Sequence, residues 1–321
     1  MNILSWNCRG VGRSRTVQEL VRLVRTYNPK IVFLSETRQC DERVRNLKWR
    51  LGLRNCLTAK GVGKGGGLSL FGDENLDVEL LSIGENHVDV LVKEQDKDLK
   101  WRGTFVYGEP RVQDRHLMWE RLRTLKNKSS APWVMIGDFN EAMWSFEHFS
   151  QTRRREKQME DFREVLSQCD LHDLGFSGLP WTYNNKQEGE RNVRVCLDRA
   201  VASPSWTDLF SDAQVVHLVS SRSDHCPLLL KAEVATRERG SKRCFRYEIM
   251  WERMESLSEV IKQTWDEELL THNLLDLSSK LKSMMSSLRQ WSKEHFGSVT
   301  KELKQAKKEL EQLLLQDPVG N

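Results

Sequence analysis

Short apolar runs alternate with helical patterns along the first 232 residues of the chain. Runs of strand length, either continuous or alternating with polar positions, lie at residues 3–6, 31–34, 68–71, 88–92, 103–107, 133–136, 196–201, 215–219 and 227–230. Apolar residues at helical spacing predict amphipathic helices over residues 16–26 and 157–168. The pattern is therefore typical of a domain that mixes strands and helices.

Many short strands with helices between them favour a layered domain of the mixed α/β (α+β) class. The hydrophobic pattern alone leaves two arrangements open. One is a doubly wound sheet, and the other is a pair of packed sheets flanked by helices.

The character of the chain changes after about residue 233. Residues 233–244 are polar, charged and contain glycine, as a linker does, and residues 245–316 show helical patterns. The last predicted helix, over residues 300–316, carries a stripe of leucines and ends before Pro318. We therefore expect a domain over 1–232, a linker over 233–244 and a helical extension over 245–321. The extension would pack on the domain or on a partner and play no catalytic role.

Length and composition narrow the class of protein further. The chain has 321 residues, 38% of them hydrophobic, which suits one large domain with a substantial core and an extension. Its net charge of +4 permits a polyanionic partner without requiring one. Seven cysteines without a C-x-x-C pair argue against a disulfide framework and favour a reducing compartment. The sequence shows neither a signal peptide nor a membrane-spanning apolar stretch, so we expect a soluble protein that is not secreted.

Polar residues that could take part in catalysis or binding lie where the apolar strands begin or end. Strand ends allow a rigid scaffold to present side chains to a cleft. Taken alone, each of these residues has a plain structural explanation as a turn residue, a cap or a core tyrosine. The candidates are Asn7, Glu36, Tyr107, Asp138, Asn140, Asp198, Asp224 and His225.

Taken together, the candidates fit one type of chemistry. Glu36 and Asp224 offer hard oxygen ligands, which suit Mg²⁺ or Mn²⁺ better than zinc. The sequence contains no cysteine pair and no H-E-x-x-H motif that would favour zinc. A divalent ion held by carboxylates stabilises charge on a phosphate. The set therefore indicates metal-assisted chemistry at a phosphate.

The order of these motifs resembles the endonuclease/exonuclease/phosphatase superfamily over about residues 1–232. The resemblance implies a four-layered αββα sandwich with a C-terminal helical extension, which resolves the two arrangements left open above. The matching motifs are WN at 6–7, SET at 35–37, Tyr107, GDFN at 137–140, LDR at 197–199 and SDH at 223–225.

The resemblance implies a metal side of the site. Glu36 would bind the ion, Asn7 would support it directly or through water, and Asp224 would lie near the metal or the leaving group. One departure concerns Arg9, because relatives that act on abasic DNA often have an acidic residue at this position. Arg9 leaves open whether one or two metal ions bind, and it argues against tight specificity for abasic sites.

The resemblance also implies a set of catalytic roles. Asp138 would orient or deprotonate the attacking water, and Asn140 and Tyr107 would contact the phosphate. His225 would bind the phosphate as an imidazolium, held by Asp198. Preorganised donors and a metal around a charge-dense transition state are chemically consistent with these roles.

The residues within these motifs look most similar to those of the endonuclease domain of plant LINE-type (non-LTR) retrotransposons. The matching stretches are WNCRG, LSET, GKGGGLSL, GDFNE, LPWTYNN, LDRAV and SDHCPLLL, and the tail segments CFRYEIMW and LRQWSKEHFGSV resemble the connector that precedes a reverse transcriptase. The similarity implies an Mg²⁺-dependent enzyme, with Mn²⁺ as a substitute, that nicks one strand of target DNA in the nucleus. The chain would then be a truncated reading frame, or a host gene derived from one. The expected DNA contacts are Arg9, Trp181, Thr182, Asn184 and Ser223; Trp181 would wedge or stack against DNA, unless it is buried.

Two other functions stay open at this stage. One is a phosphomonoesterase or phospholipid diesterase of the same superfamily, and the other is a catalytically idle relic that binds nucleic acid. Two further motifs have plain explanations. The glycine-rich segment 61–67 lacks the spacing of a phosphate-binding P-loop and indicates a glycine turn. The arginine run 153–155 is expected to be a solvated helix start, with phosphate contact as the alternative.

Overall fold

The computed structural model describes residues 1–59, 61, 66–94, 99–151, 154–233, 251–252, 254–266 and 274–296. The chain forms two compact units, Met1–Glu238 and Arg239–Asn321. The predicted helix over 300–316 and almost all of the predicted linker lie outside the described residues.

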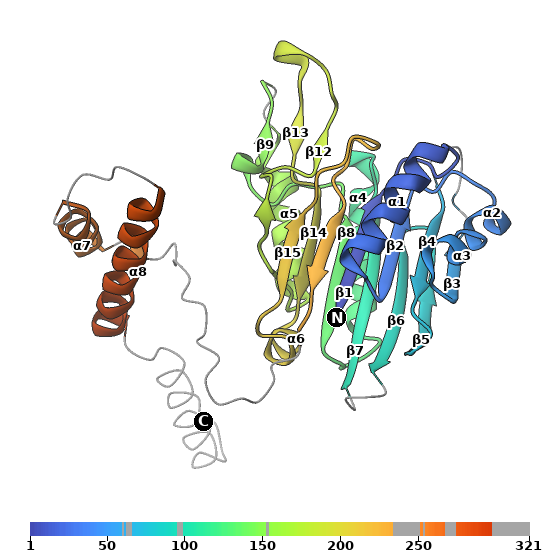
Figure 1. Ribbon diagram of the computed structural model, residues 1–321, viewed down its shortest axis with the longest axis horizontal. Coiled ribbons are helices and arrows are strands. Elements are labelled where there is room, and N and C mark those ends of the chain that lie inside the picture. The colour runs from blue at the N-terminus through green and yellow to red at the C-terminus, as the bar shows by residue number, and fades with distance from the viewer. Residues whose placement is uncertain are drawn as a thin grey trace, which may run out of the picture. The chain divides into compact units, whose positions relative to one another are not determined.

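Three sheets form the first unit (Figure 1). The largest sheet has the strand order β11 (Ser177–Gly178), β15 (Gln214–His217), β16 (Leu228–Lys231), β1 (Asn2–Asn7), β2 (Ile31–Ser35), β4 (Leu68–Gly72) and β3 (Asn55–Ala59). The second has the order β10 (His172–Asp173), β14 (Asp198–Ala202), β8 (Trp133–Asp138), β7 (Leu99–Tyr107), β6 (His87–Glu94) and β5 (Leu76–Ile83). A small third sheet has the order β12 (Tyr183–Asn184), β13 (Arg194–Val195) and β9 (His148–Phe149).

The first unit also contains both long and short helices. They are α1 (Ser14–Tyr27), α2 (Asp41–Arg45), α3 (Leu47–Leu51), α4 (Arg115–Lys126), α5 (Glu156–Gln168) and α6 (Pro204–Leu209), with single 3₁₀ turns at Val112–Asp114, Ser145–Glu147 and Gly189–Arg191. Helix α1 buries Val17, Leu20, Leu23 and Val24 on one face and ends at Asn28, which adopts a left-handed conformation before Pro29.

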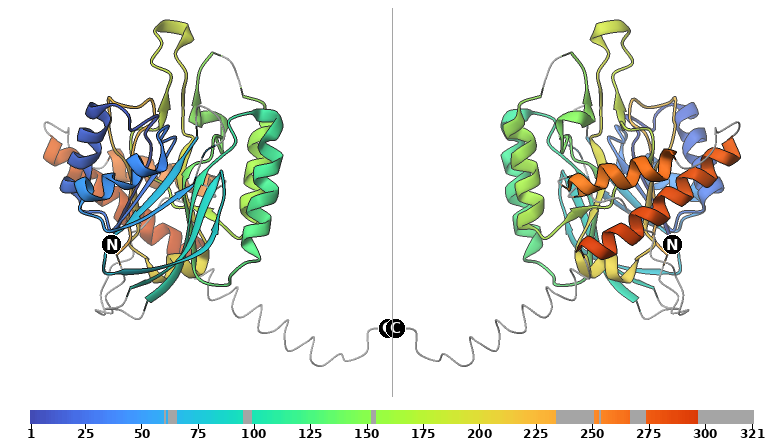
Figure 2. Two further views of the ribbon diagram at one scale, coloured as in Figure 1. Left: turned by 90° about the vertical axis from the view of Figure 1, so that its right-hand side faces the viewer. Right: turned by 90° about the vertical axis from the view of Figure 1, so that its left-hand side faces the viewer.

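The two large sheets pack face to face, and helices cover the outer face of each. Alternate side chains of both sheets, such as Phe33 and Phe105 with ring centroids 5.4 Å apart, fill the core between them. The opposite faces pack against α1 to α3 on the first sheet and against α4 and α5 on the second. Figure 2 shows these layers, with blue helices on one side of the strands and green helices on the other. The expected four-layered αββα arrangement is confirmed.

Within residues 1–232, the strands and helices predicted from hydrophobic pattern correspond to observed elements, with shifted ends. The predicted strand 196–201 begins only at Asp198, and the predicted helix 157–168 is α5. The strands β3 and β5, the helix α4 and the small third sheet were not predicted. Strand β5 is largely exposed and α4 carries many charged residues, so their apolar signal is weak.

The second unit contains the helices α7 (Glu255–Asp266) and α8 (Leu274–Phe296). They share a small core in which Trp251 and Trp291 meet edge to face, with ring centroids 5.9 Å apart. Among the described residues, no helix combines the length and the apolar character needed to cross a bilayer.

A fully buried ion pair lies on the helix-covered face of the second sheet. Both Arg102 and Asp89 are 0% exposed, and the guanidinium donates two hydrogen bonds of 2.9 and 2.8 Å to the carboxylate. Thr104 donates to the same carboxylate, and the guanidinium lies over the Trp133 ring. Strand β6 therefore buries its polar positions as well as the alternating valines that predicted it.

We expect Arg102→Met to lower the free energy of unfolding by about 3–5 kcal/mol, because Asp89 would stay buried without its counter-charge. The double variant Arg102→Met/Asp89→Leu should recover much of that loss, since neither charge then remains. Urea denaturation of both variants measures the difference. A single variant as stable as the parent would contradict the structural role of the pair.

Candidate active site

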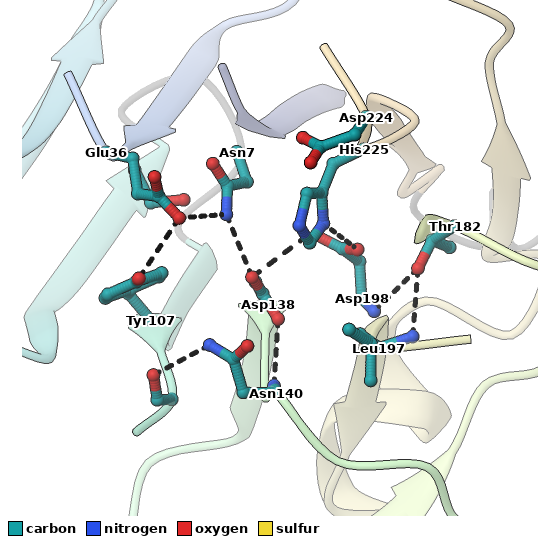
Figure 3. A network of polar contacts seen from close by, with 12 residues as sticks. Asn7, Glu36, Tyr107, Asp138, Asn140, Thr182, Leu197, Asp198, Asp224 and His225 are labelled. Carbon is teal, nitrogen blue, oxygen red and sulfur yellow. Dashed lines mark hydrogen bonds and ion pairs between the residues drawn. The ribbon is translucent and has the colours of Figure 1, made fainter. Parts of the chain in front are cut away.

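The predicted site residues lie at one common edge of the two large sheets. Strands β1 and β2 are parallel, as are β7 and β8, so the carboxyl ends of each pair point the same way. Asn7 ends β1, Glu36 follows β2, and Tyr107 and Asp138 end β7 and β8. The face-to-face packing of the sheets brings these four side chains together (Figure 3).

Two antiparallel strands bring the later residues to the same edge. Strand β14 runs opposite to β8 and starts with Asp198, which pairs in register with Asp138. Strand β16 runs opposite to β1, so His225, just before β16, lies beside the end of β1. The Trp6 indole also donates to the His225 carbonyl at 3.1 Å, which fixes this loop against β1.

Asp138, Asp198 and His225 form a buried cluster. Their exposed fractions are 1, 2 and 5%. His225 Nδ1 lies 2.8 Å from Asp198 Oδ2 and 3.8 Å from Asp138 Oδ2. Because Nδ1 faces these carboxylates, Nε2 is the ring nitrogen that can donate to a substrate oxygen.

The charges in this cluster shift the pKa values of His225 and Asp138. Burial alone would lower the pKa of His225, but the Asp198 and Asp138 carboxylates outweigh it and raise that pKa to about 9. Burial and the neighbouring Asp198 charge raise the pKa of Asp138 well above its ordinary value. His225 is therefore an imidazolium at neutral pH, while Asp138 gains basicity.

Asn7 joins this cluster to Glu36. Its Nδ2 donates to Glu36 Oε1 at 3.1 Å and to Asp138 Oδ2 at 2.9 Å. Tyr107 Oη donates to the same Glu36 oxygen at 3.1 Å. Burial and the charges of Glu36 and Asp138 raise the pKa of Tyr107, so the phenol keeps its proton. The structure places Tyr107 against Glu36, and its expected contact with a phosphate stays a prediction.

Two arginines border the Glu36 carboxylate. Arg38 forms an ion pair with Glu36 Oε2, and Arg9 lies with Nε 3.7 Å from the same oxygen. Arg9 also pairs through Nη1 with Asp224. Arg9, Glu36 and Arg38 all have left-handed φ values, between 46° and 51°, at a cost of roughly 1–2 kcal/mol each. Such concentrated backbone strain is typical of functional sites.

The glycine-rich segment 61–67 supports this strained loop where it is described. The Gly67 carbonyl accepts from the Thr37 amide at 3.1 Å, and the Gly66 carbonyl accepts from the Arg38 amide at 3.2 Å. Gly67 has φ +108°, and an added Cβ would lie 2.3 Å from the Thr37 hydroxyl. Gly66 and Gly67 thus pack on the loop that carries Glu36, whereas the predicted turn at 61–67 lies mostly outside the described residues.

The donor set fits a hard divalent cation. Glu36, Asp138, Asp198 and Asp224 bring four carboxylates against Arg9, Arg38 and His225, so negative charge is in excess. Asp138, Asp198 and His225 also lie close enough together to hold an ion. An ion at that triad would displace the proton through which His225 binds Asp198. We therefore favour Glu36, with Asn7 and Asp224 beside it, as the metal side.

The GDFN loop depends on two glycines. Gly137 has φ +149°, and an added Cβ would lie 2.0 Å from the Val106 carbonyl oxygen. A Cβ on Gly108 would lie 2.2 Å from the Phe139 oxygen. This close approach lets Asn140, at φ 55°, bond to the Gly108 carbonyl through Nδ2 at 2.9 Å. Asp138 Oδ1 accepts from the backbone amide of Asn140 at 2.8 Å, so the Asp138 carboxylate is held against the same loop.

A buried ion-pair network that sequence reasoning missed lies behind Asn140. Glu141 is 0% exposed and pairs with both Arg115 and Arg154. Arg154 also donates to the Asn140 carbonyl at 3.0 Å. The expectation of a solvated helix start at residues 153–155 is therefore wrong for Arg154; Arg153 lies outside the described residues. A run of arginines carries no signal that distinguishes a buried pair from a solvated one.

Two of the five expected DNA contacts are corrected by the structure. Thr182 is 0% exposed, and its hydroxyl accepts from the amides of Leu197 and Asp198 at 3.0 and 2.9 Å. The Ser223 hydroxyl is buried and donates to the Asn7 carbonyl at 2.8 Å. Both residues therefore position their neighbours, and their side chains are not available to DNA.

The other three expected contacts lie nearer the surface. Trp181 is half-buried, meets the Phe149 ring edge to face and carries the Arg194 guanidinium 4.7 Å from its ring centroid. The Asn184 amide donates to the Asp224 carbonyl at 2.9 Å, which ties the third sheet to the site. The Arg9 side chain is 39% exposed. DNA contact by these three residues stays a prediction.

Comparison with known proteins places these features in a family. The Endonuclease/Exonuclease/phosphatase family model matches residues 4–225. The chain is similar in structure to NExo, a 3′ phosphatase from Neisseria bound to product DNA hairpin (16% identity, TM-score 0.56, 73% of this chain and 99% of that chain). It is also similar to the endonuclease domain of TRAS1, a telomere-specific non-LTR retrotransposon (17%, 0.53, 73% and 99%). An AP endonuclease from Leishmania major matches at 15% identity (0.56, 71% and 86%). At these identities the structural likeness concerns the fold.

In the metal-free protein, we expect the His225 imidazole to lose its proton near pH 9, and Asp198→Asn to lower that pKa. A raised pKa in the folded state stabilises the protein fully below the unfolded value of about 6.5. That contribution is then lost as the pH rises through about 9. Histidine NMR titration, with His225→Gln to assign the resonance, measures the pKa. A midpoint at or below 6.5 would contradict the assignment.

We expect Glu141→Gln to lower the free energy of unfolding by about 3 kcal/mol, because two guanidiniums would lose their shared buried counter-charge. Urea denaturation measures the loss. The matched variant Glu160→Gln, on the exposed side of α5, should unfold at the parent's urea midpoint. Equal midpoints for the two variants would show that the network is dispensable.

Proposed function

The chain belongs to the Endonuclease/Exonuclease/phosphatase family, and we propose that it hydrolyses phosphodiester bonds with a divalent metal and nicks one strand of DNA. The observation that carries this proposal is the chain of polar contacts from Glu36 to Asp198: Asn7 donates hydrogen bonds to Glu36 and Asp138, His225 lies 3.8 Å from Asp138, and His225 is hydrogen-bonded to Asp198. This arrangement supports the proposal that Glu36 binds the metal, Asp138 acts as the base and His225 binds the phosphate.

Asp138 is the base in this proposal. Its raised pKa suits proton removal from water near neutral pH. Hydrogen bonds from the Asn7 side chain and the Asn140 amide hold its two oxygens in place. A water molecule oriented by Asp138 would attack the phosphorus from the side of β8.

His225 and Asn140 stabilise the charge that develops on the phosphate. His225 donates through Nε2, and the Asp198 carboxylate maintains the imidazolium and its orientation. The Asn140 amide group has a second N–H besides the one that binds Gly108. Tyr107 acts through Glu36, whose carboxylate it orients.

Mg²⁺, or Mn²⁺ in its place, would be held by Glu36 with Asn7 and Asp224 nearby. When bound, such an ion neutralises phosphate charge and stabilises the leaving oxygen. Glu36 is fixed for this task by the donors Asn7 and Tyr107.

DNA is the substrate that the surroundings of the site favour. At the third sheet, Arg194 of β13 lies over the Trp181 ring, which meets Phe149 of β9 edge to face. In the segment before β9, Arg163 of α5 lies over Trp144, and Trp144 stacks with Phe146. The exposed fractions of Trp144 and Phe146 are 43 and 70%. Aromatic faces interleaved with guanidiniums suit nucleic-acid bases and backbone. The hairpin between β12 and β13 projects beyond the two large sheets (Figures 1 and 2).

We further infer a LINE-type role, acting on nuclear DNA. The motif wording is similar to plant LINE-type endonucleases, and the fold is shared with the TRAS1 endonuclease domain. The second candidate is a phosphomonoesterase, because the similar NExo protein is a 3′ phosphatase. Release of phosphate from a 3′-phosphorylated oligonucleotide without plasmid nicking would favour this second candidate.

We expect the protein with Mg²⁺ to convert supercoiled plasmid to open circle, and chelation with EDTA to stop the reaction. Asp138→Ala and His225→Ala should each lower the nicking rate by at least about 100-fold, because each removes a group that acts on the reacting atoms. The exposed Arg22→Gln on α1 is the control and should nick at the parental rate. Undiminished nicking by either site variant would refute the assignment of these residues.

A further inference from the structure

Arg9 lies between the two carboxylates that face outward from the site. Its Nη1 pairs with Asp224, and its Nε lies 3.7 Å from Glu36 Oε2. The Asp224 and Glu36 side chains are 15 and 9% exposed, whereas the Arg9 side chain is 39% exposed. One guanidinium therefore bridges two less exposed anions from the solvent side.

This bridge, together with Arg38 on Glu36 Oε2, places positive charge on the carboxylates that a divalent ion would use. Burial alone would lower the pKa of Arg9, but Asp224 and Glu36 outweigh it and hold that pKa above its usual value. A guanidinium stays charged at every physiological pH. A divalent ion between Glu36 and Asp224 would therefore be repelled by Arg9 at this position and would compete with it for both carboxylates.

The backbone keeps a displaced Arg9 side chain next to the site. Arg9 has φ 46° and is followed by Gly10 at φ +110°, and its amide donates to Asn7 Oδ1 at 3.3 Å. The amide anchor does not involve the side chain, so the guanidinium can leave the carboxylates without unfolding the loop. A phosphate entering the site is the anion best placed to receive it.

We propose that Arg9 competes with the divalent ion for Glu36 and Asp224 and moves to a DNA phosphate when the ion binds. This proposal rests on the proposed function and deepens it. Since DNA offers Arg9 another partner, DNA binding and metal binding promote each other through this one side chain. By linkage, the coupling is equal in both directions.

The test measures Mn²⁺ affinity by calorimetry, with and without a phosphorothioate DNA duplex whose integrity is checked after each titration. Without DNA, Arg9→Gln should bind Mn²⁺ about tenfold tighter than the parent, within the range of typical couplings. With DNA, the parental affinity should rise more than that of Arg9→Gln. Arg9→Lys, which keeps the charge, should resemble the parent in Mn²⁺ affinity.

The salt dependence of DNA binding supplies an independent readout. In Mn²⁺, the slope of log affinity against log salt should fall by about one for Arg9→Gln, because one phosphate contact is lost. Arg22→Gln is the matched control, since Arg22 is an exposed arginine that pairs only with Glu19 among its described ionic contacts. Arg22→Gln should change neither the Mn²⁺ affinity nor the salt slope of DNA binding.

The outcomes separate this inference from the proposed function. Unchanged Mn²⁺ affinity in a folded Arg9→Gln protein, verified by its circular dichroism spectrum, would overturn the competition even if the parent nicks plasmid. If the parent protein does not nick DNA but Arg9→Gln binds Mn²⁺ more tightly than the parent, the competition is supported and the nuclease function is rejected. An unaltered salt slope would reject the move to phosphate.

Discussion

The Asn7 carboxamide is the contact on which the geometry of the site depends. It lies at the end of β1 in the first sheet, is 1% exposed, and donates to Asp138 at the end of β8 in the second sheet. Its other hydrogen bond reaches Glu36. One side chain thus links the two sheet edges and fixes the spacing between Glu36 and Asp138. The face-to-face packing of Phe33 and Phe105 in the core makes that short contact sustainable, because densely packed cores resist sliding.

Strain and buried charge are concentrated around this contact, and packing stabilises both. Glu36 and Asn140 adopt left-handed backbone conformations that cost free energy, and each is held by hydrogen bonds from elements distant in sequence. Glu141 is surrounded by Arg115 and Arg154 in the same way. The sandwich therefore serves as a rigid frame, and its stability allows side chains at one edge to be held in geometries that isolated loops would not adopt.

The fold was largely predictable from sequence because its signals are local. Apolar runs such as residues 31–34 and 133–136 report directly on buried strands, and motif order indicated how those strands are arranged. The site was predictable only as a list of residues. The partners that fix them are separated by tens to hundreds of positions, as for Asn7 with Asp138 or Thr182 with Asp198. No periodicity records such pairs, which is why Thr182 was expected at DNA and Arg154 in solvent. Exposed β5 and the two-residue strands of the third sheet were missed for a related reason: their pairing, more than their composition, defines them.

The charge balance of the site shows how a single residue, Arg9, affects the electrostatics of a cluster that the fold holds in place. The net charge of +4 for the whole chain says little, because the cluster itself carries four carboxylates opposed by two guanidiniums and one imidazolium. Asp198 and His225 neutralise each other deep in the cluster, which leaves the three carboxylates of Asp138, Glu36 and Asp224 against two guanidiniums. An arginine at position 9 partly offsets that imbalance within the protein itself. In the proposal above, Arg9 meets part of this negative charge itself and would turn to a substrate phosphate when an ion takes its place. The metal affinity of the site would then depend on a residue whose ion pairs are with Glu36 and Asp224.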